Sequence, residues 1–193
     1  MTGSRFLIRP AQVADAPALG EVQATSWREA YQGILPGDRL AATRPVEIGA
    51  HHAARLSNRD EHTATFVAVM PARGVVGFGV CGPSRPGPAG YPGEIHSLYA
   101  LSSVHGMGVG KALMAAMAGW LQAHALEPSY VGVLRDNRNA RGFYEHLGGR
   151  YCGERPFRWQ GIELIEALYG WANLDSMLDL ASADILPLFP KRS

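Results

Sequence analysis

The sequence predicts an α/β (α+β) fold in which helices pack against a single mixed sheet. From residue 94 onward, strand and helix patterns alternate along the chain, and this alternation is typical of helices layered on one sheet. Before residue 94, two β-branched runs separated by a short turn indicate a hairpin of the same sheet. The 193 residues contain neither an internal repeat nor a linker, so we expect one domain at residues 1–170 and a tail at 171–193.

In the first half, turn and cap residues mark where each element begins or ends. The expected elements are, in order, a strand at 6–10, a helix at 15–31, a helix at 45–58, and strands at 65–70 and 75–81. Asp15 suits the N-cap of the first helix, and Gly33 and Pro36 end its pattern. Residues 83–93 contain four prolines and three glycines, so we expect a loop there.

In the second half, the period of the apolar residues changes between two and about 3.6. The expected elements are a strand at 94–101, a helix at 109–125, a strand at 130–134, a helix at 137–147, and strands at 150–155 and 162–169. Val109, Leu113, Met117 and Leu121 form one apolar stripe on the first of these helices. Gly148 is a typical stop signal for the second.

The tail has a composition of its own. Residues 160–190 contain no Lys or Arg, and the spacing of the apolar residues at 174–181 suits a short amphipathic helix. Residues 185–189 are apolar and extended. We expect the tail to pack on its own domain, and the alternatives are a dimer contact or a lid over the site.

Composition excludes several classes of function. The chain is 47% hydrophobic and 18% charged, with 18 Lys and Arg against 17 Asp and Glu, so disorder is excluded and nothing indicates nucleic-acid binding. No apolar run is long enough for a membrane span, and the first residues do not read as a signal peptide. Cys81 and Cys152 lie in unrelated segments without metal-ligand spacing, so we expect neither a disulfide scaffold nor a metal site, and a cytoplasmic location.

A glycine-rich turn between a strand and a helix is the most informative motif. Gly106 and Gly108 precede the helix at 109–125 and Gly110 lies in its first turn, where the N-terminal N–H groups suit a phosphate. A P-loop is excluded because its first glycine position holds His105 and because Ala follows Lys111. The dinucleotide fingerprint needs a glycine where Lys111 stands. Two alternatives remain: an anion cradle of another type, or a plain tight turn.

Two blocks decide between these alternatives. Residues 94–113 resemble the central acetyl-CoA motif, Gln/Arg-x-x-Gly-x-Gly/Ala, of the GNAT superfamily of N-acyltransferases. Residues 137–148 resemble its Asn-x-x-Ala-x-x-Phe-Tyr-Glu-x-x-Gly segment, and the likeness extends over about residues 5–170. The resemblance implies one mostly antiparallel mixed sheet of six to seven strands, with a splayed central pair that holds acetyl-CoA. His105 departs from the motif, which puts a side-chain contact to phosphate in doubt or makes it pH-dependent.

The resemblance also implies which residues bind acetyl-CoA. They are Leu98, Ala100, Leu101, His105, Gly106, Met107, Gly108, Val109, Gly110, Lys111, Ala112, Asn137, Ala140, Phe143 and Tyr144. Main-chain N–H groups near residues 98–101 are the expected oxyanion donors, and residues 107–112 are expected to line the pyrophosphate. Arg135, Arg138 and Arg141 are candidates for the 3′-phosphate or, alternatively, solvated helix charges.

Transfer of acetyl to an amine needs a base and benefits from an acid, because an alkylammonium with a pKa of ~10 is not nucleophilic. By resemblance, Glu94 is the expected base and Tyr144 the acid that protonates the departing thiolate. Strand alternation places Glu94, His96 and Leu98 on one face, so His96 is a second candidate base or an orienting group for Glu94.

The acceptor side is less clear from sequence. Trp27, Arg28 and Tyr31 lie in the segment that lines the acceptor pocket in the family, and the loop at 83–93 is placed to overhang it. His51, His52 and His62 lack metalloprotease spacing, and we expect them at the surface.

The sequence thus predicts an acetyl-CoA-dependent N-acetyltransferase that works by direct transfer in a ternary complex, without a metal. The expected acceptor is the primary amine of a small molecule. A protein or peptide N-terminal amine is the first alternative, and a non-catalytic acyl-CoA-binding regulator is the second. We expect neither nucleic acid nor membrane as a partner, and a homodimer is one interpretation of the tail.

Overall fold

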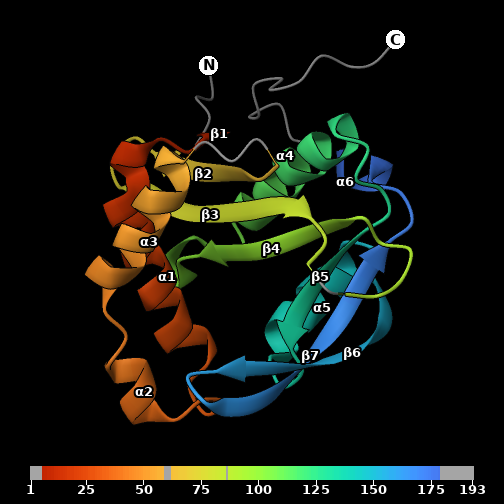
Figure 1. Cartoon of the computed structure of the whole chain (residues 1–193). Helices are drawn as coiled ribbons and strands as arrows, with labels where there is room; N and C mark the ends of the chain where they lie inside the picture. The colour runs from red at the N-terminus through yellow and green to blue at the C-terminus, as the bar shows by residue number, and fades with distance from the viewer. Residues whose placement is uncertain (1–5, 59–61, 86, 179–193) are drawn as a thin grey trace.

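A seven-stranded sheet with helices on both faces forms the protein (Figure 1). The computed structural model describes residues 6–58, 62–85 and 87–178. The strands are β1 (Leu7–Pro10), β2 (Ala64–Met70), β3 (Gly74–Pro83), β4 (Gly93–Ala100), β5 (Ser129–Leu134), β6 (Arg150–Trp159) and β7 (Ile162–Trp171). The helices are α1 (Ala16–Ala30), α2 (Gly37–Ala41), α3 (Pro45–Ser57), α4 (Val109–Ala123), α5 (Arg138–His146) and α6 (Asp175–Leu178), with short 3-10 turns η1 (Val13–Asp15) and η2 (Ser102–Val104).

The sheet has the order β1-β2-β3-β4-β5-β7-β6, and its neighbours are antiparallel except for β4 and β5. This parallel pair is joined only where residues 93–95 of β4 lie beside residues 129–131 of β5. Beyond that point each strand continues on its other neighbour, β4 on β3 and β5 on β7. The centre of the sheet therefore opens like a V, as the sequence predicted for a splayed central pair.

Each face of the sheet is covered by its own helices. Helix α4 packs Leu113, Met117 and other buried side chains against one face. On the opposite face, α1 packs Leu19 and Val22 against β2 and β3, and α3 packs on α1. In Figure 1 these two helices stand on the left, at the left-hand ends of β2 and β3. The V-shaped opening thus separates an α4 side from an α1 side.

Helices α1 and α3 approach closely because two glycines face each other. A Cβ at Gly20 of α1 would lie 2.8 Å from the backbone nitrogen of Gly49 of α3. Any side chain at Gly20 would push the helices apart, since real Cβ atoms do not approach backbone so closely. This contact fixes α1, the helix that carries Trp27 at its C-terminal end.

A bulge in β4 changes which side chains share a face. The register passes from Val80 opposite Ser97 to Cys81 opposite Ile95, so His96 is the extra residue of β4. Leu98 consequently packs with Ile95 on the α4 side, whereas Tyr99 packs on the α1 side. The expectation that Leu98 shares a face with Glu94 is therefore wrong, because simple alternation ignores the inserted residue.

The closing strands are longer than the sequence pattern indicated. Strand β6 continues through Pro156 to Trp159, and this is compatible with proline because β6 is the last strand of the sheet. In the tail, α6 buries Leu174 and Met177 against α4. The remaining tail residues, 179–193, lie outside the described residues, so the dimer contact and the lid stay predictions. None of the helices within the described ranges is long and apolar enough to cross a membrane.

Candidate functional site

The glycine turn leaves the N-terminus of α4 ready for an anion. Gly106 and Gly108 have positive φ angles of 75° and 88°, which few other residues adopt. No side chain caps the helix, and its first internal bond runs from the N–H of Ala112 to the carbonyl of Gly108. The N–H groups of residues 109–111 therefore have no partner within the helix, and these uncapped donors fit a pyrophosphate.

The side chains around this turn serve packing and support. A Cβ at Gly110 would lie 3.2 Å from the ring of Phe143, so this glycine lets α5 approach α4. Lys111 Nζ lies 3.4 Å from His146 Nε2. The ring of His105, the residue that departs from the family motif, lies with Nε2 3.1 Å from the carbonyl oxygen of Ala100. His105 thus ties the turn to the end of β4.

The main chain of β4 presents free donors to the opening. The N–H of Leu101 donates to the carbonyl oxygen of Val76 at 3.0 Å, so it is occupied by β3. Because donors alternate along an antiparallel strand, the N–H groups of Ala100 and Leu98 point the other way, toward the gap that β5 has left. These two donors suit the amides of an extended pantetheine chain or a developing oxyanion, whereas Leu101 is unsuited.

Tyr144 of α5 is buried with no hydrogen-bond partner for its hydroxyl among the described residues. Burial raises the pKa of Tyr144 far above its ordinary value, and the neighbouring Tyr99 adds to the rise. Tyr144 also acts on the pKa of Tyr31, so three phenols from three elements gather near the opening. A phenol held protonated in this way can donate a proton to a leaving thiolate.

The second motif is largely structural in its visible contacts. Asn137 caps α5, because its Oδ1 accepts the N–H of Ala140 at 3.1 Å. Arg135 lies 3.7 Å from Glu154, and Arg141 donates to the hydroxyl of Tyr169 at 2.9 Å. Arg138 has no such partner among the described residues. Of the three arginines, Arg138 is thus the one left for a phosphate.

Glu94 lies at the centre of an ion-pair network. Its side chain is fully buried; Oε2 accepts the main-chain N–H of Arg85 at 2.8 Å, and Oε1 accepts Arg85 Nη2 at 2.7 Å and Arg155 Nη2 at 3.2 Å. Burial alone would raise the pKa of Glu94, but the hydrogen bonds from Arg85 outweigh it and hold the pKa at about 2. Both carboxylate oxygens are thus occupied, and the loop after β3 is anchored to β4.

His96 lies beside this network. Its Nε2 is 3.0 Å from the carbonyl oxygen of Pro83 and 4.0 Å from Glu94 Oε2. A carbonyl only accepts, so Nε2 carries the hydrogen and Nδ1 is left as an acceptor. Burial lowers the pKa of His96, which keeps the ring neutral at pH 7.

The α1 side of the opening is lined by aromatic rings. The ring of Trp27 lies 5.5 Å from that of Trp159, 6.0 Å from that of Tyr31 and 6.5 Å from that of Tyr99. Arg28, in contrast, donates to the carbonyl oxygen of Thr43 at 2.8 Å and so is held at the connection between α2 and α3. Trp27 and Tyr31 therefore belong to this aromatic cluster, while Arg28 is directed elsewhere, and their role toward an acceptor stays a prediction.

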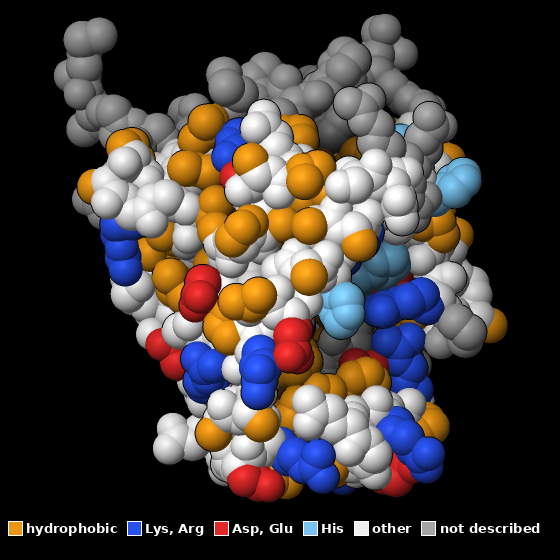
Figure 2. All heavy atoms as spheres, turned by 60° about the vertical axis from the view of Figure 1, so that its left-hand side comes forward, with side chains coloured by type: hydrophobic (Ala, Val, Ile, Leu, Met, Phe, Trp, Pro, Cys, Tyr) orange, Lys and Arg blue, Asp and Glu red, His pale blue; other side chains and the backbone are white. Residues whose placement is uncertain are grey.

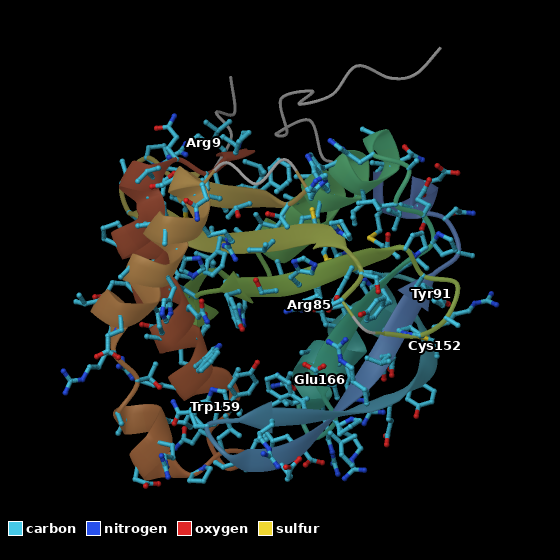
Figure 3. The ribbon with its side chains drawn as sticks, viewed as in Figure 1. Arg9, Arg85, Tyr91, Cys152, Trp159 and Glu166 are labelled. Atoms are coloured by element: carbon cyan, nitrogen blue, oxygen red, sulfur yellow. The ribbon has the colours of Figure 1, made fainter. Side chains whose placement is uncertain are left out.

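Sequence reasoning missed residues that complete this side: Arg85, Tyr99, Arg155, Trp159 and Glu166. Arg155 donates from Nε to Glu166 Oε2 at 2.6 Å, so one arginine joins Glu94 to Glu166. In Figure 3, Glu166 lies between Arg85 of the loop and Trp159 near the β6–β7 turn. Figure 2 shows a recess on this side, bordered by histidine and by Lys or Arg side chains. The one sequence signal for such a network is the share of arginine, which makes up 16 of the 18 Lys and Arg residues.

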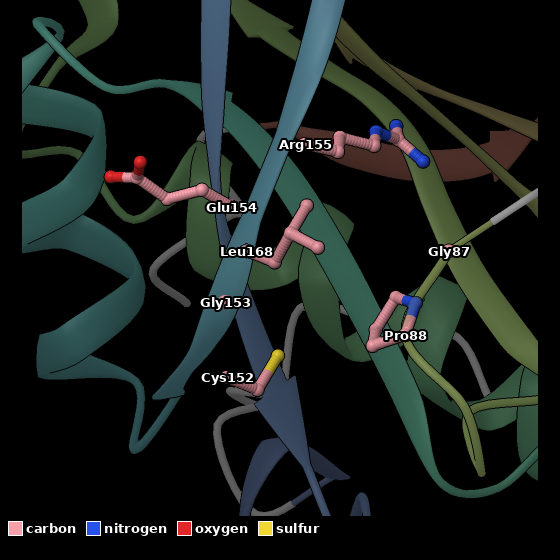
Figure 4. Close-up of a pocket in the computed structure, with 7 residues that line it drawn as sticks. All are labelled: Gly87, Pro88, Cys152, Gly153, Glu154, Arg155 and Leu168. Carbon is pink, nitrogen blue, oxygen red and sulfur yellow. The ribbon is translucent and has the colours of Figure 1, made fainter.

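A second hollow, of about 480 Å³, lies on the outer side of the same arginine (Figure 4). Its lining comprises Gly87, Pro88, Cys152, Gly153, Glu154, Arg155 and Leu168. Cys152 is the extra residue of a bulge in β6, and burial raises the pKa of its thiol. The described residues contain no group of three or more His, Cys, Asp and Glu side chains that could hold a metal ion.

One of the histidines expected at the surface is buried. His52 is 7% exposed, and its ring lies edge-on to Phe78. Its Nδ1 faces Arg55 at 2.9 Å, so Nδ1 accepts and Nε2 donates to Gln23 at 2.8 Å. Burial, helped by Arg55, lowers the pKa of His52 to about 4. The surface expectation failed because the inward face of α3 carries polar residues that satisfy one another.

Three features describe the class of protein. It has an uncapped helix behind a glycine turn, free main-chain donors where the sheet parts, and a buried phenol. This combination suits a protein that binds an acyl-CoA in the opening of its sheet. The profile described as "Acetyltransferase (GNAT) family" matches residues 24–149. The chain is 30% identical to the uncharacterized N-acetyltransferase YuaI of Bacillus subtilis over 173 residues, or 90% of this chain and 96% of YuaI. The chain belongs to the GNAT acetyltransferase family.

Solved structures agree with this assignment at the level of the fold. The PaiA N-acetyltransferase of Thermoplasma acidophilum, crystallised with coenzyme A, gives a TM-score of 0.66 at 17% identity, over 84% of this chain and 97% of that one. YncA of Salmonella typhimurium, a putative acetyltransferase crystallised with acetyl-CoA, gives 0.65 at 18% identity, over 88% and 94%. The protein is thus an N-acetyltransferase whose co-substrate is acetyl-CoA.

Gly108→Ala tests the glycine turn. The left-handed backbone at Gly108 costs an alanine roughly 1–2 kcal/mol, so the affinity for coenzyme A measured by titration calorimetry should fall about tenfold. Gly37→Ala is the control, because Gly37 has an ordinary φ and open space around its Cα. Equal affinities in the two variants would contradict the role given to the turn.

Glu94→Gln tests the ion-pair network through stability. At pH 7 the variant should lose about 3 kcal/mol of unfolding free energy, because two arginines lose a buried partner. The wild-type contribution is present above the ordinary carboxyl pKa of 4.5 and is lost as the pH falls toward 2, so the two proteins should converge there in urea titrations. Glu47→Gln, in an exposed pair with Arg44, should change little; a constant gap down to pH 2 would contradict the depressed pKa.

Proposed function

We propose that the protein transfers acetyl from acetyl-CoA directly to the primary amine of a small molecule, in a ternary complex. The observation that carries this proposal is the opening between β4 and β5, with the glycine turn and Tyr144 on its α4 side and an aromatic recess on its α1 side. Reactants that enter from the two sides meet in the gap. The loop after β3, anchored by Arg85 to Glu94, narrows the recess and favours a small acceptor over a folded protein surface.

Besides the base, which takes the first proton of the ammonium, three groups of this chain take part in the proposed reaction. The main-chain N–H groups of Leu98 and Ala100 stabilise the oxyanion while the C–N bond forms. As the C–S bond breaks, Tyr144 donates its proton to the sulfur and regains one from the reacting nitrogen. The sum is one ammonium and one thioester converted into an amide, a thiol and one proton released to water.

The base is proposed from two candidates. Glu94 has both oxygens bonded and a pKa of about 2, so it receives a proton only after Arg85 or Arg155 moves away. His96 is neutral at pH 7 and has Nδ1 available, and this supports His96 as the base, with Glu94 holding the arginines in place. His96→Gln should then remove the acidic limb of the pH–rate profile, and Glu94→Gln should keep it.

Two further features of the protein remain part of this proposal. Both cysteines are free thiols, which supports a reducing, cytoplasmic location together with the use of acetyl-CoA. The proposal of a homodimer is based on the apolar sequence of residues 185–189, which lie outside the described ranges.

Thiol release from acetyl-CoA, measured with a panel of primary amines and a peptide with a free N-terminus, tests the function. We expect turnover with small amines and formation of the acetylated amine by mass spectrometry. Turnover with the peptide alone would replace the small-molecule acceptor with a peptide. Tight acetyl-CoA binding without turnover on any acceptor would indicate a regulator and overturn the proposal.

Tyr144→Phe tests the proton donor. Loss of a general acid costs about a hundredfold in rate, so kcat should fall by that order while the affinity for acetyl-CoA is unchanged. Tyr151→Phe is a matched control, since Tyr151 is an exposed tyrosine of β6. An unchanged kcat in Tyr144→Phe would remove this residue from the mechanism.

A further inference from the structure

Glu166 of β7 stands directly beside the opening of the sheet. A Cβ at Gly132 of β5 would lie 2.7 Å from Glu166 Oε2, so the carboxylate crosses β5 at a position where a side chain is missing. Gly132 follows Val131, the last residue of β5 that pairs with β4. The carboxylate therefore lies where the two strands begin to part.

One oxygen of this carboxylate is engaged and the other is not. Oε2 accepts Arg155 Nε at 2.6 Å, while Oε1 has no hydrogen-bond partner among the described residues. The side chain is 13% exposed, and Oε1 is not one of the polar atoms closed off from solvent, so a donor that enters the recess can reach it. Glu94, by contrast, has both oxygens filled by the two arginines. Glu166 is thus the carboxylate of the recess that retains capacity for a further donor.

Aromatic rings face this carboxylate. Burial is the main cause of the raised pKa of Tyr31 and of Tyr99, and the negative charge of Glu166 adds to both, so both hydroxyls lie within its field. Trp27 lies between these tyrosines and Trp159, and its indole N–H is buried without a partner. Aliphatic side chains of the α1–α2 connection and of β5–β7, such as Ile34, Leu134 and Leu164, pack around the same rings. The recess thus combines one carboxylate with an apolar, aromatic wall.

We propose that Glu166 binds the ammonium group of the acceptor through Oε1, and that the aromatic side chains enclose the carbon skeleton that bears it. The preferred acceptor is then a primary amine on an apolar chain or ring. An ammonium gains both from the carboxylate and from the faces of Trp and Tyr rings, while a polar skeleton would leave its hydrogen bonds unmade against them. Held at Glu166, the nitrogen lies beside the opening into which Leu98 and Ala100 direct their N–H groups. This inference rests on the proposed function and adds the class of acceptor to it.

Binding of an unreactive probe tests the inference without turnover. N,N-Dimethyl-2-phenylethylamine, protonated at pH 7, carries the cation, one N–H donor and the ring but forms no stable amide, and its affinity is measured by titration calorimetry with coenzyme A present. Glu166→Gln should weaken its binding about tenfold, the value of a single charged interaction. Glu166→Asp keeps the charge and should recover part of the affinity. Glu163→Gln is the matched control, because Glu163 lies on the same strand, is exposed and pairs with Arg158.

Steady-state kinetics provide the second measurement. With 2-phenylethylamine, Glu166→Gln should raise KM about tenfold or more with a smaller change in kcat, and the KM for acetyl-CoA should stay constant. In the wild type, kcat/KM for 2-phenylethylamine should exceed that for ethanolamine at least tenfold.

The outcomes separate the inference from the function on which it rests. Equal probe affinity in Glu166→Gln and wild type, or a preference for ethanolamine, would overturn the inference. Acetylation of any small amine by the wild type would still support the proposed function. A wild type that binds the probe through Glu166 and acetylates no amine would overturn the proposed function instead. Circular dichroism and thermal melts of each variant show whether a loss reflects the site or the fold.

Discussion

The parting of β4 from β5 after three paired residues is the constraint on which the site depends. A parallel pair in the middle of a sheet would ordinarily continue, because unpaired main-chain groups in a protein interior are costly. Here β3 and β7 hold the two strands on diverging courses, and the donors left free at Leu98 and Ala100 become part of the site. The helices lie on either side of this geometry, because α4 packs on one face of the sheet and α1 on the other.

The sequence predicted the order and the type of almost every element, because each carried a local signal. Proline and glycine marked the loop at 83–93, Gly148 marked the end of α5, and the apolar stripe of α4 was unambiguous. The inserted residue at His96 had no such signal. A bulge depends on how β3 pairs with β4, and pairing is a property of two segments that a reading of one strand does not contain.

The candidate site likewise contains residues that carried a local sequence signal and residues that did not. The turn at residues 106–110 and Tyr144 belong to contiguous motifs, and for that reason they were identifiable. Arg85, Arg155 and Glu166 come from three separate segments, and nothing around any of them indicates the partner it meets. The resemblance assigned Glu94 to the site, yet the sequence did not reveal that arginines bind both of its carboxylate oxygens. The charge state of a buried carboxylate is set by neighbours that only the folded chain brings together.

Arg155 couples two segments of the protein in addition to neutralising two carboxylates. It bonds to Glu94, which holds the loop after β3, and to Glu166, which belongs to the β6–β7 hairpin. Two walls of the recess therefore share one guanidinium, and a cation held at Oε1 of Glu166 shares the charge of that carboxylate with Arg155, which is bonded to Oε2. Thermodynamic linkage makes this coupling reciprocal. A change that weakens the bond between Arg155 and Glu166 leaves Arg155 to bond more fully to Glu94. A mutation that loosens the loop after β3 likewise changes the affinity of Glu166 for a cation.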